Sequence, residues 1–166
     1  MGHWLIKQEQ LVDGAASEGA TIEASNAPAE ADRAAILGAL SAFNADHGYP
    51  ADMLPVAVLL KDGDGKTVGG LWGKTVYDWL FVEFLVVPDA MRGHDFGTRL
   101  MLEAEALAIE RGCVGAWLTT FNFQARPFYE GLSYQVFGEL EQSPRDCVRL
   151  FMRKKLACRD DRTAQV

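Results

Sequence analysis

Residues 87–97 join an apolar stretch to a predicted helix, and they combine Arg92 with glycines at 93 and 97. A helix N-terminus leaves several backbone N–H groups without partners and carries the positive end of the helix dipole. When glycine precedes them, such groups can surround an anion, usually a phosphate. The spacing lacks the three glycines of a dinucleotide-binding loop, and Thr98 follows Gly97 without the lysine of a P-loop. The junction can therefore surround an anion without matching either nucleotide-binding loop, and the alternative is an ordinary helix start, since many helices that open with arginine and glycine bind no ligand.

A second candidate is Glu83, the one charged residue in the apolar run of residues 79–87. Burial of a carboxylate disfavours its charged form and raises its pKa. A glutamate whose pKa approaches neutrality is a good general base. The alternative is a structural carboxylate paired with a cation such as Lys74. Both interpretations stay open at this stage.

Residues 119–129 supply the third candidate group, with Asn122 followed by Tyr129. Taken alone, Tyr129 beside Phe128 is typical of a core aromatic, and Asn122 is an ordinary helix N-cap. Pro127 has no backbone N–H for a helical hydrogen bond, so it would lie too deep in a helix capped at Asn122. We therefore expect a short helix within residues 124–130 that begins late or irregularly.

Several predicted elements precede these groups along the chain. Residues 21–24 are predicted to form a short strand, and the helical spacing of apolar residues predicts a helix over 29–43. Strands at 56–61 and about 67–77 flank an Asp-Gly-Asp-Gly sequence that is typical of a hairpin. Apart from Glu83, residues 79–87 are apolar at both the odd and the even positions. This pattern predicts a strand that is covered on both faces. The glycines among residues 69–73 indicate a bulge or a close backbone approach.

The remaining elements follow the junction. A helix over about 97–111 has a predicted buried stripe, with Arg99, Glu103, Glu105 and Glu110 on its wet side and Gly112 ending it. Strands are predicted at 116–120, 134–138 and 148–153. This order predicts a mixed α/β (α+β) single domain over residues 20–156, with a mostly antiparallel central sheet flanked by helices. Residues 1–19 are expected to be a loose leader and residues 157–166 a flexible tail.

Composition narrows the function classes. The chain of 166 residues is 49% hydrophobic and 23% charged, as in an ordinary globular domain. Its net charge of −7 disfavours nucleic acid as a partner and attracts cations. Cys113, Cys147 and Cys158 share no metal-ligand spacing, so no metal is expected. The absence of a long apolar run or a signal peptide predicts a cytoplasmic protein without a membrane partner.

Two sequence blocks resemble the GNAT superfamily, the acetyl-coenzyme A-dependent N-acetyltransferases. The family's pyrophosphate loop has Gln or Arg, then Gly at the fourth place, then Gly or Ala at the sixth. Here Arg92 and Gly97 match, while Asp95 stands where the family usually has glycine. The second block is matched by Asn122, Ala125, Tyr129, Glu130 and Tyr134. The resemblance covers about residues 21–156 and is strongest to a bacterial branch whose substrates are mostly unassigned.

The resemblance implies a role for each candidate residue. The sheet is expected to splay between two parallel strands, where the main chain around Leu85, Val86 and Val87 pairs with the pantetheine arm. Asn122 is expected to contact that arm or a water, and Tyr129 to return a proton to the departing thiolate. Glu83 is expected to act as the base. The pyrophosphate is expected on the backbone of the loop, formed by Arg92, Gly93, His94, Asp95, Phe96, Gly97 and Thr98.

Asp95 departs from the family pattern, and it suggests a rival function. We expect a positive φ at this position and a side chain that caps the helix, in competition with the phosphates. The leading prediction is acetyl transfer from acetyl-CoA to a primary amine, on a small molecule or a protein, by direct attack through a tetrahedral intermediate. The alternative is a non-catalytic acyl-CoA-binding regulatory domain on the same fold. A homodimer is left open.

Overall fold

The computed structural model describes residues 19–156, and the chain divides into two compact units, Met1–Leu40 and Ser41–Val166. Helix α1 (Glu30–Asp46) spans the boundary between them and confirms the helix predicted over residues 29–43. The strand predicted at residues 21–24 is wrong, because these residues are exposed and join no sheet. The predicted leader, apart from Gly19, and the predicted tail lie outside the described residues.

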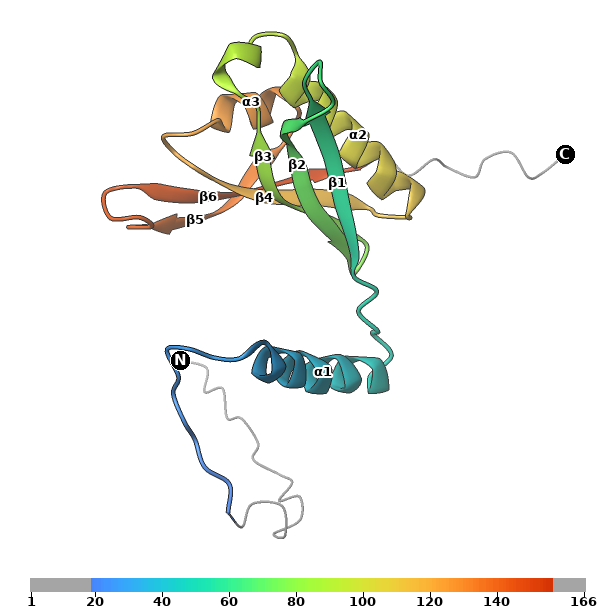
Figure 1. The fold of residues 1–166 in the computed structure, drawn as a ribbon, viewed down its shortest axis with the longest axis vertical. Helices are drawn as coiled ribbons and strands as arrows, with labels where there is room; N and C mark the ends of the chain where they lie inside the picture. Colours follow the sequence, from blue (N-terminus) through green and yellow to red (C-terminus); the bar gives the residue numbers. More distant parts are fainter. Residues whose placement is uncertain (1–18, 157–166) are drawn as a thin grey trace, which may run out of the picture. The chain divides into compact units, whose positions relative to one another are not determined.

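The second unit is built on a six-stranded sheet with the order β1-β2-β3-β4-β6-β5 (Figure 1). Every neighbouring pair is antiparallel except β3 and β4, which run parallel. The fold is therefore the predicted mixed α/β arrangement. The strands are β1 (Leu54–Lys61), β2 (Thr67–Val76), β3 (Trp79–Val86), β4 (Gly115–Phe121), β5 (Gln135–Glu141) and β6 (Val148–Lys155).

Helix α2 (Phe96–Glu110) makes the crossover from β3 to β4 and packs against β1, β2 and β3. Its buried stripe includes Leu100, Met101, Ala104 and Ala108, one helical turn apart. The helix ends as predicted, because Gly112 has φ +81° and the N–H of Cys113 donates to the carbonyl of Ala108. No helix within residues 19–156 combines the length and apolar character needed to cross a membrane.

A β-bulge at Glu83 changes which side chains of β3 face the core. Trp72 of β2 pairs with Phe84 and the next residue pairs with Val82, so Glu83 is the extra residue. Val82 is buried before the bulge, whereas Phe84 beyond it is 65% exposed. The prediction that this strand is covered on both faces is therefore wrong for its second half. The close approach predicted at the glycines is present, because a Cβ on Gly73 would collide with the carbonyl of Phe81.

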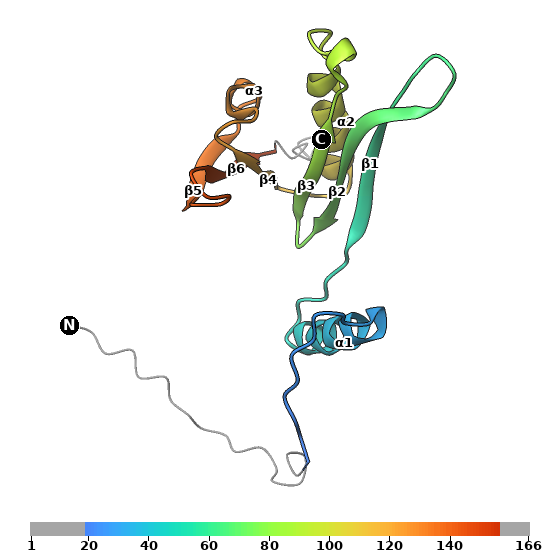
Figure 2. The same cartoon turned by 60° about the vertical axis from the view of Figure 1, so that its left-hand side comes forward.

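The parallel pairing of β3 with β4 stops early. It runs from Trp79 and Gly115 to Val82 and Leu118, and the strands then diverge. Figure 2 shows this divergence toward the end of the sheet that carries the N-terminus of α2 and the short helix α3 (Arg126–Gly131). Beyond the bulge, β3 consequently has no β4 partner for its main chain.

Candidate active site

The diverging strands border a cavity of about 910 Å³. Its walls come from the second half of β3, the N-terminus of α2, the end of β4 and α3. The sequence-predicted residues among those lining it are Glu83, Leu85, Val86, Val87, Arg92, Gly93, Asp95, Phe96, Gly97, Thr98 and Tyr129. Residues far apart in the chain are thus brought to one hollow, as the resemblance implied. His94 and Asn122 are not among the lining residues.

The N-terminus of α2 offers unpartnered backbone donors to this cavity. The first helical hydrogen bond runs from the N–H of Arg99 to the carbonyl of Asp95. The N–H groups of residues 96–98 precede it and have no carbonyl of the helix to bind. These residues all line the cavity. The arrangement suits an anion, because the donors and the positive end of the helix dipole point the same way.

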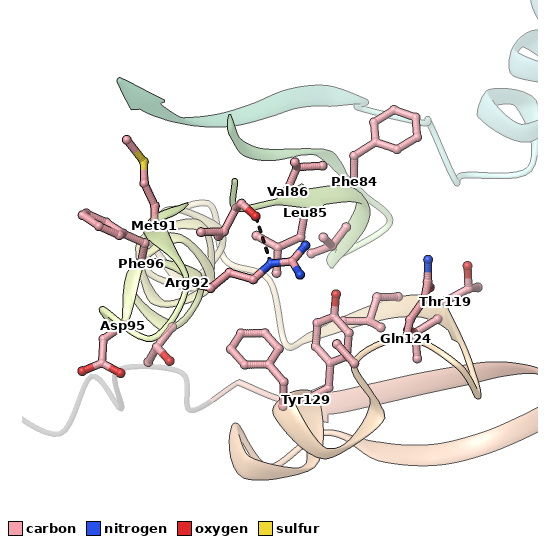
Figure 3. Close-up of a pocket in the computed structure, with 18 of the residues that line it drawn as sticks. Phe84, Leu85, Val86, Met91, Arg92, Asp95, Phe96, Thr119, Gln124 and Tyr129 are labelled. Carbon is pink, nitrogen blue, oxygen red and sulfur yellow. Dashed lines mark hydrogen bonds between the residues drawn. The ribbon is translucent and has the colours of Figure 1, made fainter. Parts of the chain in front are cut away.

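Asp95 adopts the predicted left-handed conformation, with φ 58° and ψ 10°. Its carboxylate makes no capping hydrogen bond, so the predicted side-chain cap is wrong. Figure 3 shows the carboxylate directed away from Arg92 and Tyr129, at the outer edge of the cavity. An N-cap oxygen reaches the helix N–H groups when the backbone at this position is extended, and the left-handed backbone turns the side chain elsewhere. The donors of the loop therefore stay available.

Arg92 is held at the rim of the cavity. Its Nε donates to the carbonyl oxygen of Val87 at 3.3 Å (Figure 3), and its guanidinium pairs with Asp89 at 2.9 Å. Both partners of this ion pair are largely exposed, so the pair contributes little stability. His94 is exposed as well and bonds through Nδ1 to the carbonyl of Arg92. Arg92 is thus the one arginine or lysine among the predicted loop residues.

Tyr129 projects from α3 into the middle of the cavity. The residue is only 8% exposed, and Figure 3 shows its hydroxyl directed toward β3. No hydrogen bond to that hydroxyl is formed within the described residues, and no buried polar side-chain atom there lacks a partner. The hydroxyl therefore faces the cavity rather than the packed core. Burial raises the pKa of Tyr129 above its usual value of 10.

Glu83 lines the cavity from the β-bulge and carries a partner. Its Oε1 lies 2.6 Å from Nζ of Lys74 on β2, and the two side chains are about a quarter and a third exposed. The ion pair, one of the two alternatives left open by the sequence, is therefore present. It is not exclusive of a role at the site, because the carboxylate still borders the cavity.

Asn122 is not among the residues that line the cavity, and it forms hydrogen bonds with the main chain of Val148 instead. Its Oδ1 accepts the N–H of Val148 at 3.3 Å, and its own N–H donates to the carbonyl of the same residue. Helix α3 begins at Arg126, which places Pro127 within its first two positions and confirms the late start. The capping role considered for Asn122 is therefore wrong.

Sequence reasoning missed two residues that shape the site. Gln124 accepts hydrogen bonds from Oγ1 of Thr120 at 3.2 Å and from the N–H of Phe121 at 3.0 Å, which fixes the turn after β4. Phe128 packs over Gly97, since a Cβ at that glycine would lie 3.2 Å from the ring. The glycine in the predicted loop was a signal for close approach, but nothing in the sequence named the aromatic partner.

Comparison with known proteins identifies the family. The sequence model of the acetyltransferase (GNAT) family matches residues 21–134. The chain belongs to the GNAT acetyltransferase family. An acetyltransferase from Agrobacterium fabrum is 37% identical over 114 residues, which are 69% of this chain and 82% of that protein. The blasticidin-S acetyltransferase of Streptomyces morookaense is 38% identical over 81 residues, 48% of this chain and 60% of its own length.

Solved structures of GNAT proteins agree with this placement. The crystal structure of an acetyltransferase from Agrobacterium tumefaciens superposes with a TM-score of 0.73 at 33% identity, over 82% of this chain and 98% of the other. An aminoglycoside 6′-N-acetyltransferase in complex with coenzyme A gives 0.55 at 22% identity, over 64% and 76%. The second likeness concerns the fold alone.

Proposed function

We propose that this GNAT protein transfers an acetyl group from acetyl-coenzyme A to a primary amine on a small molecule. One observation carries the proposal. A single cavity is bordered by the open edge of β3, the first N–H groups of α2 and the hydroxyl of Tyr129, and within residues 19–156 neither these N–H groups nor the hydroxyl has a hydrogen-bond partner. An acyl-CoA has an anionic pyrophosphate, an amide-bearing arm and a reactive thioester. The three features of the cavity match these three parts in chemistry.

The cofactor end of the site uses main-chain atoms. The N–H groups of residues 96–98 and Arg92 would hold the pyrophosphate, because both favour negative charge. The edge of β3 at residues 84–86 would pair with the amides of the pantetheine arm as an additional strand does. A thioester held this way supplies an activated acetyl group. The edge of β3 is free to take such a partner because its pairing with β4 ends at Val82.

The chemical step needs proton transfers that the side chains of the cavity can perform. The attacking amine must be neutral, so its ammonium form must first lose a proton, and Glu83 borders the cavity as an acceptor. As the C–N bond forms, the carbonyl becomes an oxyanion that needs a donor, and a main-chain N–H of β3 is suited to this. The C–S bond then breaks, and the sulfur takes a proton.

Tyr129 is suited to supply that last proton. A thiol has a pKa of about 8.5, and a phenol raised above 10 by burial stays protonated throughout the neutral range. Its hydroxyl faces the cavity and has no competing protein partner among the described residues. General acid catalysis of this kind contributes about 10²- to 10⁴-fold to a rate.

A cationic small molecule is the acceptor class that we favour. The net charge of −7 attracts amines, which are protonated in solution. One relative, the blasticidin-S acetyltransferase, is named for a small-molecule substrate. The rival proposal of a non-catalytic regulatory domain depended on Asp95 occupying the helix donors. Because Asp95 makes no such bond, no observation favours that rival.

Release of free thiol from acetyl-CoA, measured against a panel of amines that includes blasticidin S and an aminoglycoside, tests the proposal. At least one amine should give turnover, with the acetylated amine seen by mass spectrometry. Tyr129→Phe should bind acetyl-CoA with unchanged affinity and turn over about 10²- to 10⁴-fold more slowly, because only the acidic hydroxyl is lost. Tyr77→Phe, on the β2–β3 turn, is the matched control. Acetyl-CoA binding without turnover on any amine would instead favour the regulatory alternative.

A further inference from the structure

Glu105 of α2 is the only charged residue that is buried in the described part of the chain, at 5% exposure. The sequence placed it on the wet side of the helix, and this prediction is wrong. It lies on the buried stripe, one turn after Met101 and one turn before Ala108. Its charge is compensated from two sides. The hydroxyl of Tyr134 donates to Oε1 at 3.0 Å, and Nζ of Lys154 lies 2.6 Å from Oε2.

These three residues come from three separate elements. Glu105 belongs to α2, Tyr134 lies in the connection from α3 to β5, and Lys154 belongs to β6. Apolar residues of similar size would fill the same space without the cost of removing charges from water, and such replacements are often neutral or stabilising. The network is therefore better explained by the geometry that its directional bonds impose than by stability alone.

That geometry bears on Tyr129 through Tyr134. The N–H of Tyr134 donates to the carbonyl of Tyr129 at 3.0 Å, and the two rings meet edge to face with centroids 6.1 Å apart. Phe128 contacts the phenol ring of Tyr129 in the same manner at 5.1 Å. Since the hydroxyl of Tyr129 has no hydrogen-bond partner within residues 19–156, ring packing sets its direction. The ring of Tyr134 packs against one side of the Tyr129 ring, and the hydrogen bond from the Tyr134 hydroxyl to Glu105 fixes the position of Tyr134.

The same network also joins the two ends of the candidate site. Helix α2 carries the pyrophosphate donors at its N-terminus and Glu105 further along, while the Tyr134 segment follows directly from α3 with Tyr129. A bond between Glu105 and Tyr134 therefore fixes the helix that would hold the cofactor against the residue that would protonate its sulfur. Proton transfer requires heavy atoms within about 2.6–3.2 Å, so small displacements matter.

We propose that Glu105, Tyr134 and Lys154 are positioning residues, which hold the phenol of Tyr129 at the distance and angle needed for proton transfer. The inference rests on the proposed function, in which Tyr129 is the acid. The proposal gives a role to Tyr134, which belongs to the second sequence block. It also gives a role to the buried carboxylate of Glu105, which takes no part in the chemical step. None of the three residues lines the cavity, so they act on the reaction through Tyr129.

A double-mutant cycle between Tyr134 and Tyr129 tests this proposal. Tyr134→Phe removes one hydroxyl and keeps the ring and the Glu105–Lys154 pair. We expect kcat to fall about ten-fold while KM for acetyl-CoA stays within two-fold, because the acid is displaced but the cofactor contacts are intact. In a Tyr129→Phe background the same change should have no further effect, because the residue through which Tyr134 acts has lost its proton. Equal slowing in both backgrounds overturns the proposal.

Glu105→Gln tests whether the carboxylate itself is needed for positioning. Its matched control is Glu103→Gln, at an exposed position of the same helix. Glu105→Gln should lower kcat by at least as much as Tyr134→Phe, and the control should not. Glu105→Gln leaves Lys154 without its counter-charge, so the added Lys154→Met change should restore part of the melting temperature but not kcat. Full recovery of kcat in that double variant would mean that the network is structural only, and would also overturn the proposal.

A spectroscopic measurement can show whether the positioning role is wrong independently of whether the proposed acetyl transfer is wrong. The chain has four tyrosines, so 3-fluorotyrosine labelling gives four ¹⁹F resonances, each assignable by a single Tyr→Phe change. Glu105→Gln should shift or broaden the Tyr129 resonance and leave those of Tyr49 and Tyr77 unchanged. This readout needs no turnover. An unmoved Tyr129 signal contradicts the positioning role even if the enzyme is active, and a shifted signal in a chain without acetyl transfer leaves only the proposed function in error.

Discussion

Single residues at this site show two different ways in which a charge can be compensated. Glu83 is partly open to solvent and pairs with Lys74, whereas Glu105 is buried and needs both a cation and a hydroxyl. The local sequence does not distinguish the partly exposed glutamate from the buried one, because both have apolar residues on either side. The difference arises from partners far along the chain, such as Lys154, 49 positions after Glu105. Lys74 could be named from the sequence because it and Glu83 lie on consecutive predicted strands, at about 67–77 and at 79–87.

The first residue-scale prediction concerns Glu83 as the base. Glu83→Gln should lower kcat by about 10²-fold or more, because the amide cannot accept the proton of the attacking ammonium. Lys74→Met is the matched control, since it removes the ion-pair partner and keeps the carboxylate, and it should retain most of kcat. An unchanged kcat in Glu83→Gln would assign the proton to a water chain instead.

The second residue-scale prediction concerns Asp95, whose φ of 58° suits glycine, asparagine and aspartate. Because no cap is lost, Asp95→Asn should change the free energy of unfolding by less than about 0.5 kcal/mol, within the ordinary range for surface sites. Removing one exposed charge from a helix N-terminus is worth about 0.3–1 kcal/mol toward an anion, so acetyl-CoA should bind about two- to five-fold more tightly. Isothermal titration measures this.

Salt provides the control for that titration. Exposed charges are screened within about 10 Å at 0.1 M salt, so the gain in affinity should shrink as salt is raised. Asp95→Gly should behave like Asp95→Asn, because both keep the left-handed turn. Weaker binding by both variants would show that the carboxylate supports the loop rather than opposing the phosphates.

At the scale of elements, the alternation of apolar and polar residues predicts which face of a strand is buried, as long as the strand contains no bulge. The buried positions of β1, β2 and β4 follow alternation, and these strands formed close to their predicted bounds. In β3 the bulge at Glu83 reverses the parity, so Phe84 and Val86 are exposed. A continuous apolar run conceals such a reversal, because every position has the same character. The same bulge places Glu83 at the splay, where the site lies.

The packing of α2 against α3 is tight at one point and predicts the effect of a small substitution. In Gly97→Ala the new Cβ would lie 3.2 Å from the ring of Phe128, so that ring or the helix must move. Overpacking costs about 1–3 kcal/mol, against which a better helix former returns at most about 1 kcal/mol. We expect a net loss of roughly 1–2 kcal/mol in stability and a weaker affinity for acetyl-CoA, by calorimetry.

Two further variants decide the cause of that loss. Gly131→Ala, at the end of α3, adds the same methyl group where no atom lies within 4 Å and should lower neither the stability nor the affinity. Phe128→Leu combined with Gly97→Ala should recover stability, because the shorter side chain makes room. A double variant no better than Gly97→Ala would place the fault in the loop conformation instead of the contact.

For the whole molecule, family and fold were accessible from the sequence, whereas the acceptor was not. The phosphate loop and the Asn-Tyr block are local patterns imposed by main-chain geometry, so they can be read without a structure. The strand predicted at residues 21–24 is absent, because within residues 19–156 no strand pairs with this segment. The acceptor is chosen by side chains gathered from several elements, and no local pattern encodes such a surface.

The final prediction uses the stability of the entire chain as a readout of ligand binding. A ligand bound only by the folded state at 100 times its Kd adds about 2.7 kcal/mol to the free energy of unfolding. For a domain of this size each kcal/mol raises Tm by about 2–4 °C, so saturating acetyl-CoA should raise Tm by roughly 5–11 °C. Adenosine 3′,5′-bisphosphate, which lacks the pantetheine arm, should raise it less, and NADH should have almost no effect despite its pyrophosphate. The order of the three shifts is more informative than their size. If the helix donors alone were responsible for binding, the three ligands would raise Tm to a similar extent, whereas only acetyl-CoA can also pair with the open edge of β3. Equal shifts with NADH and acetyl-CoA would mean that the splay does not bind the arm.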